Sequence, residues 1–91
     1  MKKYELTSET KVFNGHTLHR IRALIDFADV HKGDLGGWIE KEDNLAQDGN
    51  AWVRDNAQVS GNAQVCGDAQ VYGDAQVYGG ARVSGGAQIN R

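Results

Sequence analysis

The sequence has no proline and only one cysteine, Cys66, among its 91 residues. A lone cysteine cannot form an internal disulfide, so other contacts must hold the fold together. The lack of proline argues against a disordered linker, in which proline and glycine usually rise together. No histidine is adjacent to Cys66 in the sequence, and we interpret this thiol as non-catalytic.

Long apolar runs and a strong excess of one charge sign are also missing. No segment approaches the length of a membrane span, and the basic start Met1-Lys2-Lys3 is not followed by the apolar stretch of a signal peptide. The net charge of −2 provides no basic surface for nucleic acid. We therefore expect a cytoplasmic protein that contacts neither membranes nor nucleic acid directly.

Glycine, by contrast, is frequent, with 12 residues, and many of them belong to a tandem array that begins at residue 49. The array divides without insertion into the hexads GNAWVR, DNAQVS, GNAQVC, GDAQVY, GDAQVY, GGARVS and GGAQIN. Alanine occupies the third position of every hexad, and valine or isoleucine occupies the fifth. Residues two apart on a strand point to the same side, so each hexad predicts a short strand with these two side chains inward, followed by a turn.

The array resembles the hexapeptide-repeat proteins, whose left-handed parallel β-helix uses three hexads for each triangular coil. The resemblance implies that residues 18 apart stack in outward columns. One column contains Trp52, Arg54, Gln70, Tyr72 and Gln88. We predict that this column is a protein-binding face, because Trp, Tyr and Arg dominate interface hot spots. The alternative for Trp52 is packing against an N-terminal cap.

Residues 1–48 do not repeat. Asn14-Gly15 is a strong turn signal and predicts a β-hairpin, although a strand and a short helix remain alternatives for residues 16–27. We expect an all-β fold: a left-handed parallel β-helix with an N-terminal β-hairpin cap. The hairpin and cap region would span residues 1–34 and the solenoid residues 35–91, regular from residue 49, within a single folded unit.

The cap should protect the exposed strand edges at one end of the solenoid. We expect it to include Phe27, Val30, Leu35 and Trp38. These residues lie in or beside the segment Asp-Phe-x-Asp-Val-x-x-Gly-x-x-Gly-Gly-Trp at residues 26–38, which resembles uncharacterised bacterial and prophage proteins. The YdcK-like proteins are relatives of that group and are labelled transferases by their fold. The resemblance brings no established chemistry to particular residues.

The prophage-type resemblance implies a non-enzymatic interaction protein that binds a host protein, such as an inhibitor of a CRISPR effector or another antiviral defence component. The alternatives are a trimeric hexapeptide acyltransferase-like enzyme and a purely structural oligomer. His16, His19 and His31 all precede the repeats, which argues against the enzyme. His31 would be its candidate base, and His16 would be an exposed turn residue. We predict no catalytic residue, metal ligand or cofactor.

The last hexad is as regular as the others, and only Arg91 follows it. Its strands would then present unpaired backbone groups, which are a template for pairing. We predict a homodimer about a two-fold axis through Val83, Ala87, Ile89 and Asn90. The alternative is a trimer through the flat faces.

Overall fold

The computed structural model describes residues 2–91, and within them all regular structure is β except one 3-10 turn. The all-β class expected from the sequence is confirmed. The elements are β1 (Tyr4–Phe13), β2 (His16–Ala23), β3 (Leu35–Ile39), η1 (Glu42–Asn44), β4 (Trp52–Val53), β5 (Gln58–Val59), β6 (Gln64–Val65), β7 (Gln70–Tyr72), β8 (Gln76–Val77), β9 (Arg82–Val83) and β10 (Gln88–Asn90). No helix in this part of the chain is long and apolar enough to cross a membrane.

The N-terminal hairpin is formed by β1 and β2, which pair antiparallel from Tyr4↔Ala23 to Phe13↔His16. The turn between them places Asn14 at φ 51° and Gly15 at φ 80°, a left-handed conformation that asparagine and glycine adopt most readily. Of the two alternatives for residues 16–27, the strand is therefore what forms, up to residue 23.

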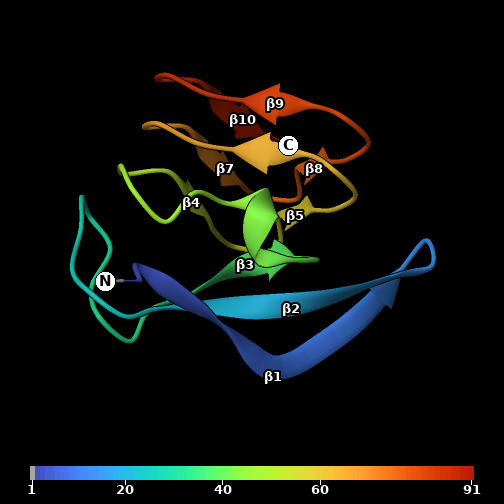
Figure 1. Cartoon of the computed structure of the whole chain (residues 1–91), viewed down its shortest axis with the longest axis horizontal. Coiled ribbons are helices and arrows are strands. Elements are labelled where there is room, and N and C mark those ends of the chain that lie inside the picture. Colours follow the sequence, from blue (N-terminus) through green and yellow to red (C-terminus); the bar gives the residue numbers. More distant parts are fainter. Residues whose placement is uncertain (1) are drawn as a thin grey trace.

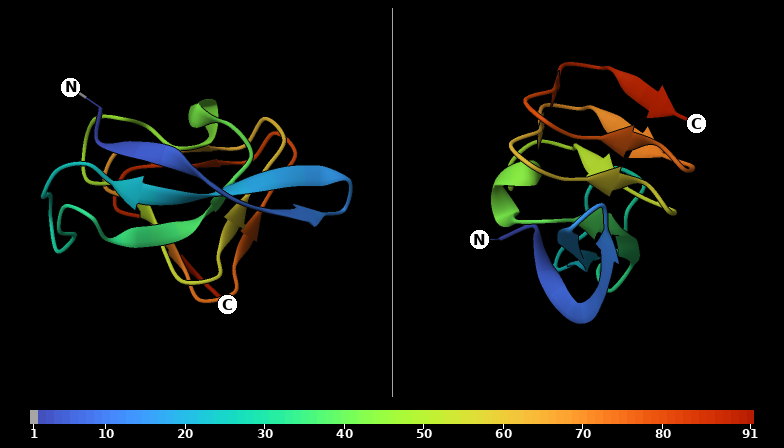
Figure 2. Two further views of the ribbon diagram at one scale, coloured as in Figure 1. Left: turned by 90° about the horizontal axis from the view of Figure 1, so that it is seen from below. Right: turned by 90° about the vertical axis from the view of Figure 1, so that its right-hand side faces the viewer.

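The hexads form a stack of coils above this hairpin, as Figures 1 and 2 show. Their strands pair in parallel with partners 18 residues further along, for example Gln58↔Gln76 and Gln64↔Arg82. Three ladders result. Their strand orders are β1-β2-β3-β5-β8, β4-β7-β10 and β6-β9. Each coil therefore contains three hexads, and from β4 onward consecutive strands belong to different ladders.

The core of the stack consists of the inward alanine and valine columns. Ala57, Val59, Ala69 and Val71 have no exposed surface. Burial decreases toward the last coil, where Val83 remains buried and Ala81 is exposed. The inward side chains are small because the space inside each coil is narrow.

Apart from the bonds between paired strand residues, the backbone hydrogen bonds between coils run from the amides of one coil to the carbonyls of the next. The first coil therefore has carbonyl groups that point away from the stack and need donors from elsewhere in the chain. On the first ladder β3 supplies them, since the amides of Trp38 and Glu40 donate to Ala57 O and Val59 O at 3.0 and 3.1 Å.

On the other two ladders, side chains donate hydrogen bonds to the carbonyl groups of the first coil. The Asn44 Nδ2 atom, fully buried after β3, donates to Gly61 O at 3.2 Å and to Ala63 O at 2.9 Å. The buried Lys3 Nζ atom donates to Gly49 O at 3.3 Å and to Ala51 O at 2.7 Å. The Asn44 side-chain amide and the Lys3 ammonium therefore donate the hydrogen bonds that the amides of a further strand would donate to these carbonyls.

The predicted cap cluster forms in part. Val30 and Trp38 are buried and Phe27 packs against the core, as expected, but Leu35 is 54% exposed. Leu35 is the first residue of β3 and pairs with Arg22 at the hairpin edge, so its side chain does not reach the coil interior.

Candidate functional site

A groove of about 220 Å³ lies between the hairpin turn and the outer face of β5 and β8. Its walls combine residues at the hairpin turn with residues of the first ladder, all of them outward except the core residue Val77. They are Phe13, Asn14, His16, Gln58, Ser60, Gln76, Val77 and Tyr78. The β1–β2 hairpin runs across the end of the stack, and this brings its turn to a face formed some 45 residues later in the sequence.

A carboxylate contacts the histidine that lines this groove. His16 begins β2, and its Nδ1 atom lies 3.1 Å from Oε1 and 3.0 Å from Oε2 of Glu40, the residue that follows β3. Glu40 Oε1 also accepts a hydrogen bond from the Gly61 amide at 2.7 Å. The hydrogen bonds from His16 and Gly61 hold the pKa of the Glu40 carboxyl below its usual value, so this side chain is ionised near neutral pH.

The arrangement fixes one imidazole nitrogen and leaves the other for a ligand. In the neutral tautomer that has its proton on Nδ1, that nitrogen donates to Glu40, and Nε2 is unprotonated and can accept a proton. A base oriented by a carboxylate is the constellation that general acid–base catalysis requires. His16 is the first residue after the hairpin turn and its side chain is 42% exposed, as expected for a turn residue, but its ring also contacts Glu40.

The other candidate nucleophiles and bases are less organised. His31 is exposed, and its ring makes no hydrogen bond to any residue of the described chain. Cys66 is free and lines a separate hollow with Glu42 and Asp43. No group of three or more possible metal ligands occurs within residues 2–91.

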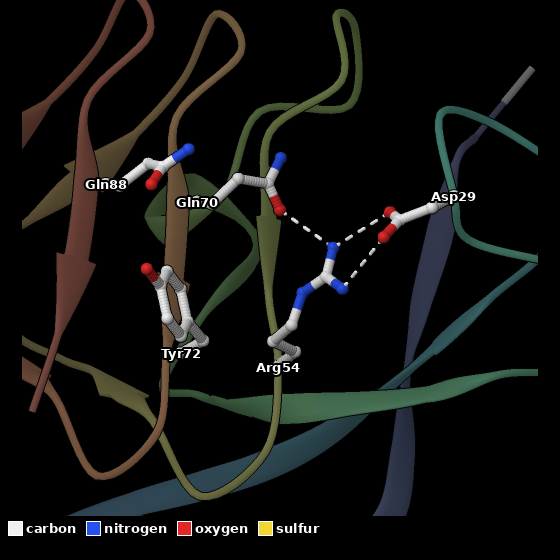
Figure 3. A pocket seen from close by; sticks show the side chains of 5 residues that line it. All are labelled: Asp29, Arg54, Gln70, Tyr72 and Gln88. Carbon is white, nitrogen blue, oxygen red and sulfur yellow. Dashed lines mark hydrogen bonds and ion pairs between the residues drawn. The ribbon is translucent and has the colours of Figure 1, made fainter.

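Four of the five residues predicted as a binding face do lie together. Arg54, Gln70, Tyr72 and Gln88 line a second groove of about 310 Å³ on the β4-β7-β10 ladder, together with Asp29 (Figure 3).

Trp52, the fifth residue, is not available on that surface. Its side chain is only 2% exposed, because the rings of Phe27 and Tyr4 pack edge-on against it at centroid distances of 5.2 and 6.3 Å. The cap thus covers a position that the hexad pattern assigns to the outside. The alternative interpretation, packing of Trp52 against the cap, describes what forms.

The four residues predicted for self-association lie in the last two hexads. Val83 is buried, Ala87 is half-buried, and Ile89 and Asn90 are exposed, with Ile89 at 36%. Strands β8, β9 and β10 are the outermost strands of their ladders in the described chain. Self-association through this edge stays a prediction.

Comparison with known proteins yields one informative similarity. No protein-family model matches the chain. A protein of Escherichia coli K12 named uncharacterized acetyltransferase YdcK is 41% identical over an alignment of 63 residues, which covers 60% of this chain and 19% of that protein. The chain therefore spans about a fifth of the relative's length, and the similarity supports a YdcK-like relationship.

This similarity contradicts the expectation of a non-enzymatic, phage-type interaction protein that inhibits host defence. The relative carries the name of an acetyltransferase, which favours the acyltransferase alternative. The argument against an enzyme was that every histidine precedes the repeats. That argument fails because the hairpin returns His16 to the face of the coils.

Proposed function

We propose that this chain is an acyltransferase of the hexapeptide-repeat type, which transfers an acyl group from coenzyme A to an acceptor bound beside His16. The observation that carries the proposal is the contact of Glu40 with His16, which lines a groove on the coil face. The name of the relative supports the same reaction class. Because the chain spans only about a fifth of that relative's length, the name of the relative does not by itself establish the activity of this chain.

In the proposed reaction, His16 Nε2 takes the proton of the acceptor's hydroxyl or amine group as that group attacks the thioester carbonyl. A C–O or C–N bond forms, the C–S bond breaks, and the proton passes from the imidazolium to the departing thiolate. Glu40, held by the Gly61 amide, stabilises the imidazolium between these two steps. A positioned base of this kind contributes roughly 10²- to 10⁴-fold to the rate.

We also propose that the coils form the left-handed parallel β-helix of hexapeptide-repeat proteins. Two observations support it: the period of 18 residues in the parallel ladders, and the positive φ of the glycines that begin the hexads, such as 63° at Gly61 and 66° at Gly67. A crystal structure of the chain would give the hand directly, and a right-handed coil would contradict the proposal.

Binding of acetyl-coenzyme A, measured by calorimetry, is the first experiment. The second follows thiol release from acetyl-coenzyme A with a panel of amine and hydroxyl acceptors. We expect His16→Asn to lower the rate roughly 10²- to 10⁴-fold while the fold is retained. Glu40→Gln should lower it less, because the base remains but its orientation and charge partner are lost.

His31→Asn is the matched control, since it removes an exposed histidine that lies outside the groove. It should leave the rate unchanged. The absence of both acetyl-coenzyme A binding and thiol release in the wild type would contradict the proposal. A rate that depends on His31 and not on His16 would retain the enzyme but reject the site.

A further inference from the structure

The groove on the β4-β7-β10 ladder is independent of the His16 groove, which belongs to another ladder. Its polar side chains project from one face of the stack beside the loop of residues 24–34, as Figure 3 shows. They belong to Asp29, Arg54, Gln70, Tyr72 and Gln88, which enclose a volume of about 310 Å³. That volume is at the lower end of the range for small-molecule sites.

Among the described residues that line this groove, Arg54 is the one cation, and it is already paired with a carboxylate. Its two terminal nitrogens donate to the two oxygens of Asp29 at 3.3 and 3.1 Å, the two-pronged geometry by which arginine recognises carboxylates and phosphates. Gln70 Oε1 accepts a further bond from Arg54 at 2.8 Å, and Gln70 Nε2 donates to Asn50 O at 2.9 Å. The guanidinium is therefore held in place from the coil side by a residue that is itself fixed.

Asp29, in contrast, is weakly attached. It lies in the loop before β3, its side chain is 73% exposed, and its neighbour Ala28 has a φ of 48° that alanine rarely adopts. An ion pair as exposed as this one contributes little to stability and is readily exchanged. The Arg54 side chain is less exposed, at 30%, and its Nε atom is buried without a partner among residues 2–91.

We propose that this groove binds a small oxyanion ligand, a carboxylate or a phosphate, which displaces Asp29 from Arg54. In the absence of the ligand, the Asp29 carboxylate takes its place and accepts the hydrogen bonds of the Arg54 guanidinium. Gln88 and Tyr72 make no side-chain hydrogen bond to another described residue, and both line the groove. They provide an amide and a hydroxyl donor for the remaining atoms of the ligand. The inference does not depend on acyl transfer.

The chain offers a matched control for Arg54. Arg82 donates an equivalent bond to Gln64 Oε1 at 2.8 Å on the β6-β9 ladder. It is an arginine–glutamine pair between neighbouring coils, like Arg54 and Gln70, but none of the ion pairs of the described chain joins Arg82 to a carboxylate. A nonspecific attraction of anions to arginine would act on both pairs alike.

The experiment is a titration of the ¹⁵N-labelled chain at constant ionic strength, with succinate in one series and inorganic phosphate in another. We expect saturable shifts of the Arg54 Nε–H signal and of the Gln70 and Gln88 amide signals. Asp29→Asn should bind about two- to fivefold more tightly, because the competing exposed ion pair is gone. Arg54→Gln should lose binding, and Arg82→Gln should bind like the wild type.

The anion that binds with the higher affinity identifies the ligand as a carboxylate or a phosphate, and either result supports the proposal. Absence of a saturable shift with both anions would overturn it. So would an Asp29→Asn variant that binds no more tightly than the wild type, or equal losses in Arg54→Gln and Arg82→Gln. Arg54→Lys separates charge from geometry. It keeps the cation but lacks the two-pronged donor, and it should bind more weakly than the wild type.

Discussion

Asn44 closes one ladder of the stack, and replacing it by aspartate keeps its shape while exchanging its donating NH2 group for a carboxylate oxygen and adding a buried negative charge. Its Oδ1 atom accepts hydrogen bonds from the amides of Glu40 and Lys41 at 3.0 and 2.8 Å, and its Nδ2 atom donates to Gly61 O and Ala63 O. Asn44→Asp keeps the shape and the two accepted bonds. It places a second oxygen against the two carbonyl oxygens, so both donated bonds become repulsive contacts.

The magnitude follows from those two bonds. Each lost hydrogen bond costs about 1 kcal/mol net, and a buried carbonyl left without a partner costs about 1 kcal/mol or more in addition. We therefore expect the free energy of unfolding to fall by at least about 4 kcal/mol at neutral pH, where the new carboxylate also buries a charge. A chain of this size typically has a total of about 5–14 kcal/mol, so a variant that still folds should melt roughly 15–30 °C lower.

Urea denaturation monitored by tryptophan fluorescence is the assay, because Trp38 and Trp52 are both buried in the cap region. Asn62→Asp is the control. Asn62 is an exposed corner residue whose Oδ1 atom accepts a bond from Lys41 Nζ at 3.0 Å, and aspartate preserves that bond. Equal stability of Asn44→Asp and Asn62→Asp would refute the argument that Asn44 replaces a missing strand.

Three further predictions concern stability and assembly. Burial lowers the pKa of Lys3 to about 8 from 10.5, so the ammonium, which is still present near neutral pH, loses its proton more readily in the folded state than in the unfolded chain. The resulting contribution to stability is present above pH 10.5 and is lost as the pH falls through 8. The difference in unfolding free energy between wild type and Lys3→Met should therefore grow by about 2 kcal/mol from pH 7 to pH 10 in urea titrations, and a difference that shrinks with pH would contradict the shift. Gly36→Ala should destabilise the chain by at least about 1–3 kcal/mol in thermal melts, because a Cβ atom there would lie 2.5 Å from Val53 O, whereas Gly80→Ala, with no atom within 4 Å, should be tolerated; similar melts for the two variants would show that the cap is not tightly packed. Light scattering should give the molar mass of a dimer for the wild type and that of a monomer for Ile89→Lys, because the lysine would place a charge in the predicted contact at the edge of the last coil; a wild type that is itself monomeric would exclude this contact.

The candidate site was recognisable from the sequence only in part. The Asn14-Gly15 turn predicted the hairpin, and with it the start of β2 at His16. Nothing in the local pattern predicted that Glu40, 24 residues later, would lie against the imidazole. That contact depends on β3 pairing with β2 on one side and with β5 on the other. A glutamate that follows a buried strand, together with a histidine at a hairpin turn, was the available signal.

The hexad period by itself determined which alanine and valine positions point inward and which positions point outward, because a local rule repeated seven times leaves little freedom. The 18-residue spacing between stacked strands came from the resemblance to hexapeptide-repeat proteins and not from the period. Only the tertiary structure decided how the first coil ends. Lys3 and Asn44 act there through contacts more than 15 residues away in the sequence, and Trp52 is covered by a loop although its position in the hexad is outward. A repeat specifies the contacts between equivalent units. The end of the stack has no equivalent unit below it, so its unpaired carbonyls and exposed side chains are satisfied by whichever non-repeating residues fold against them.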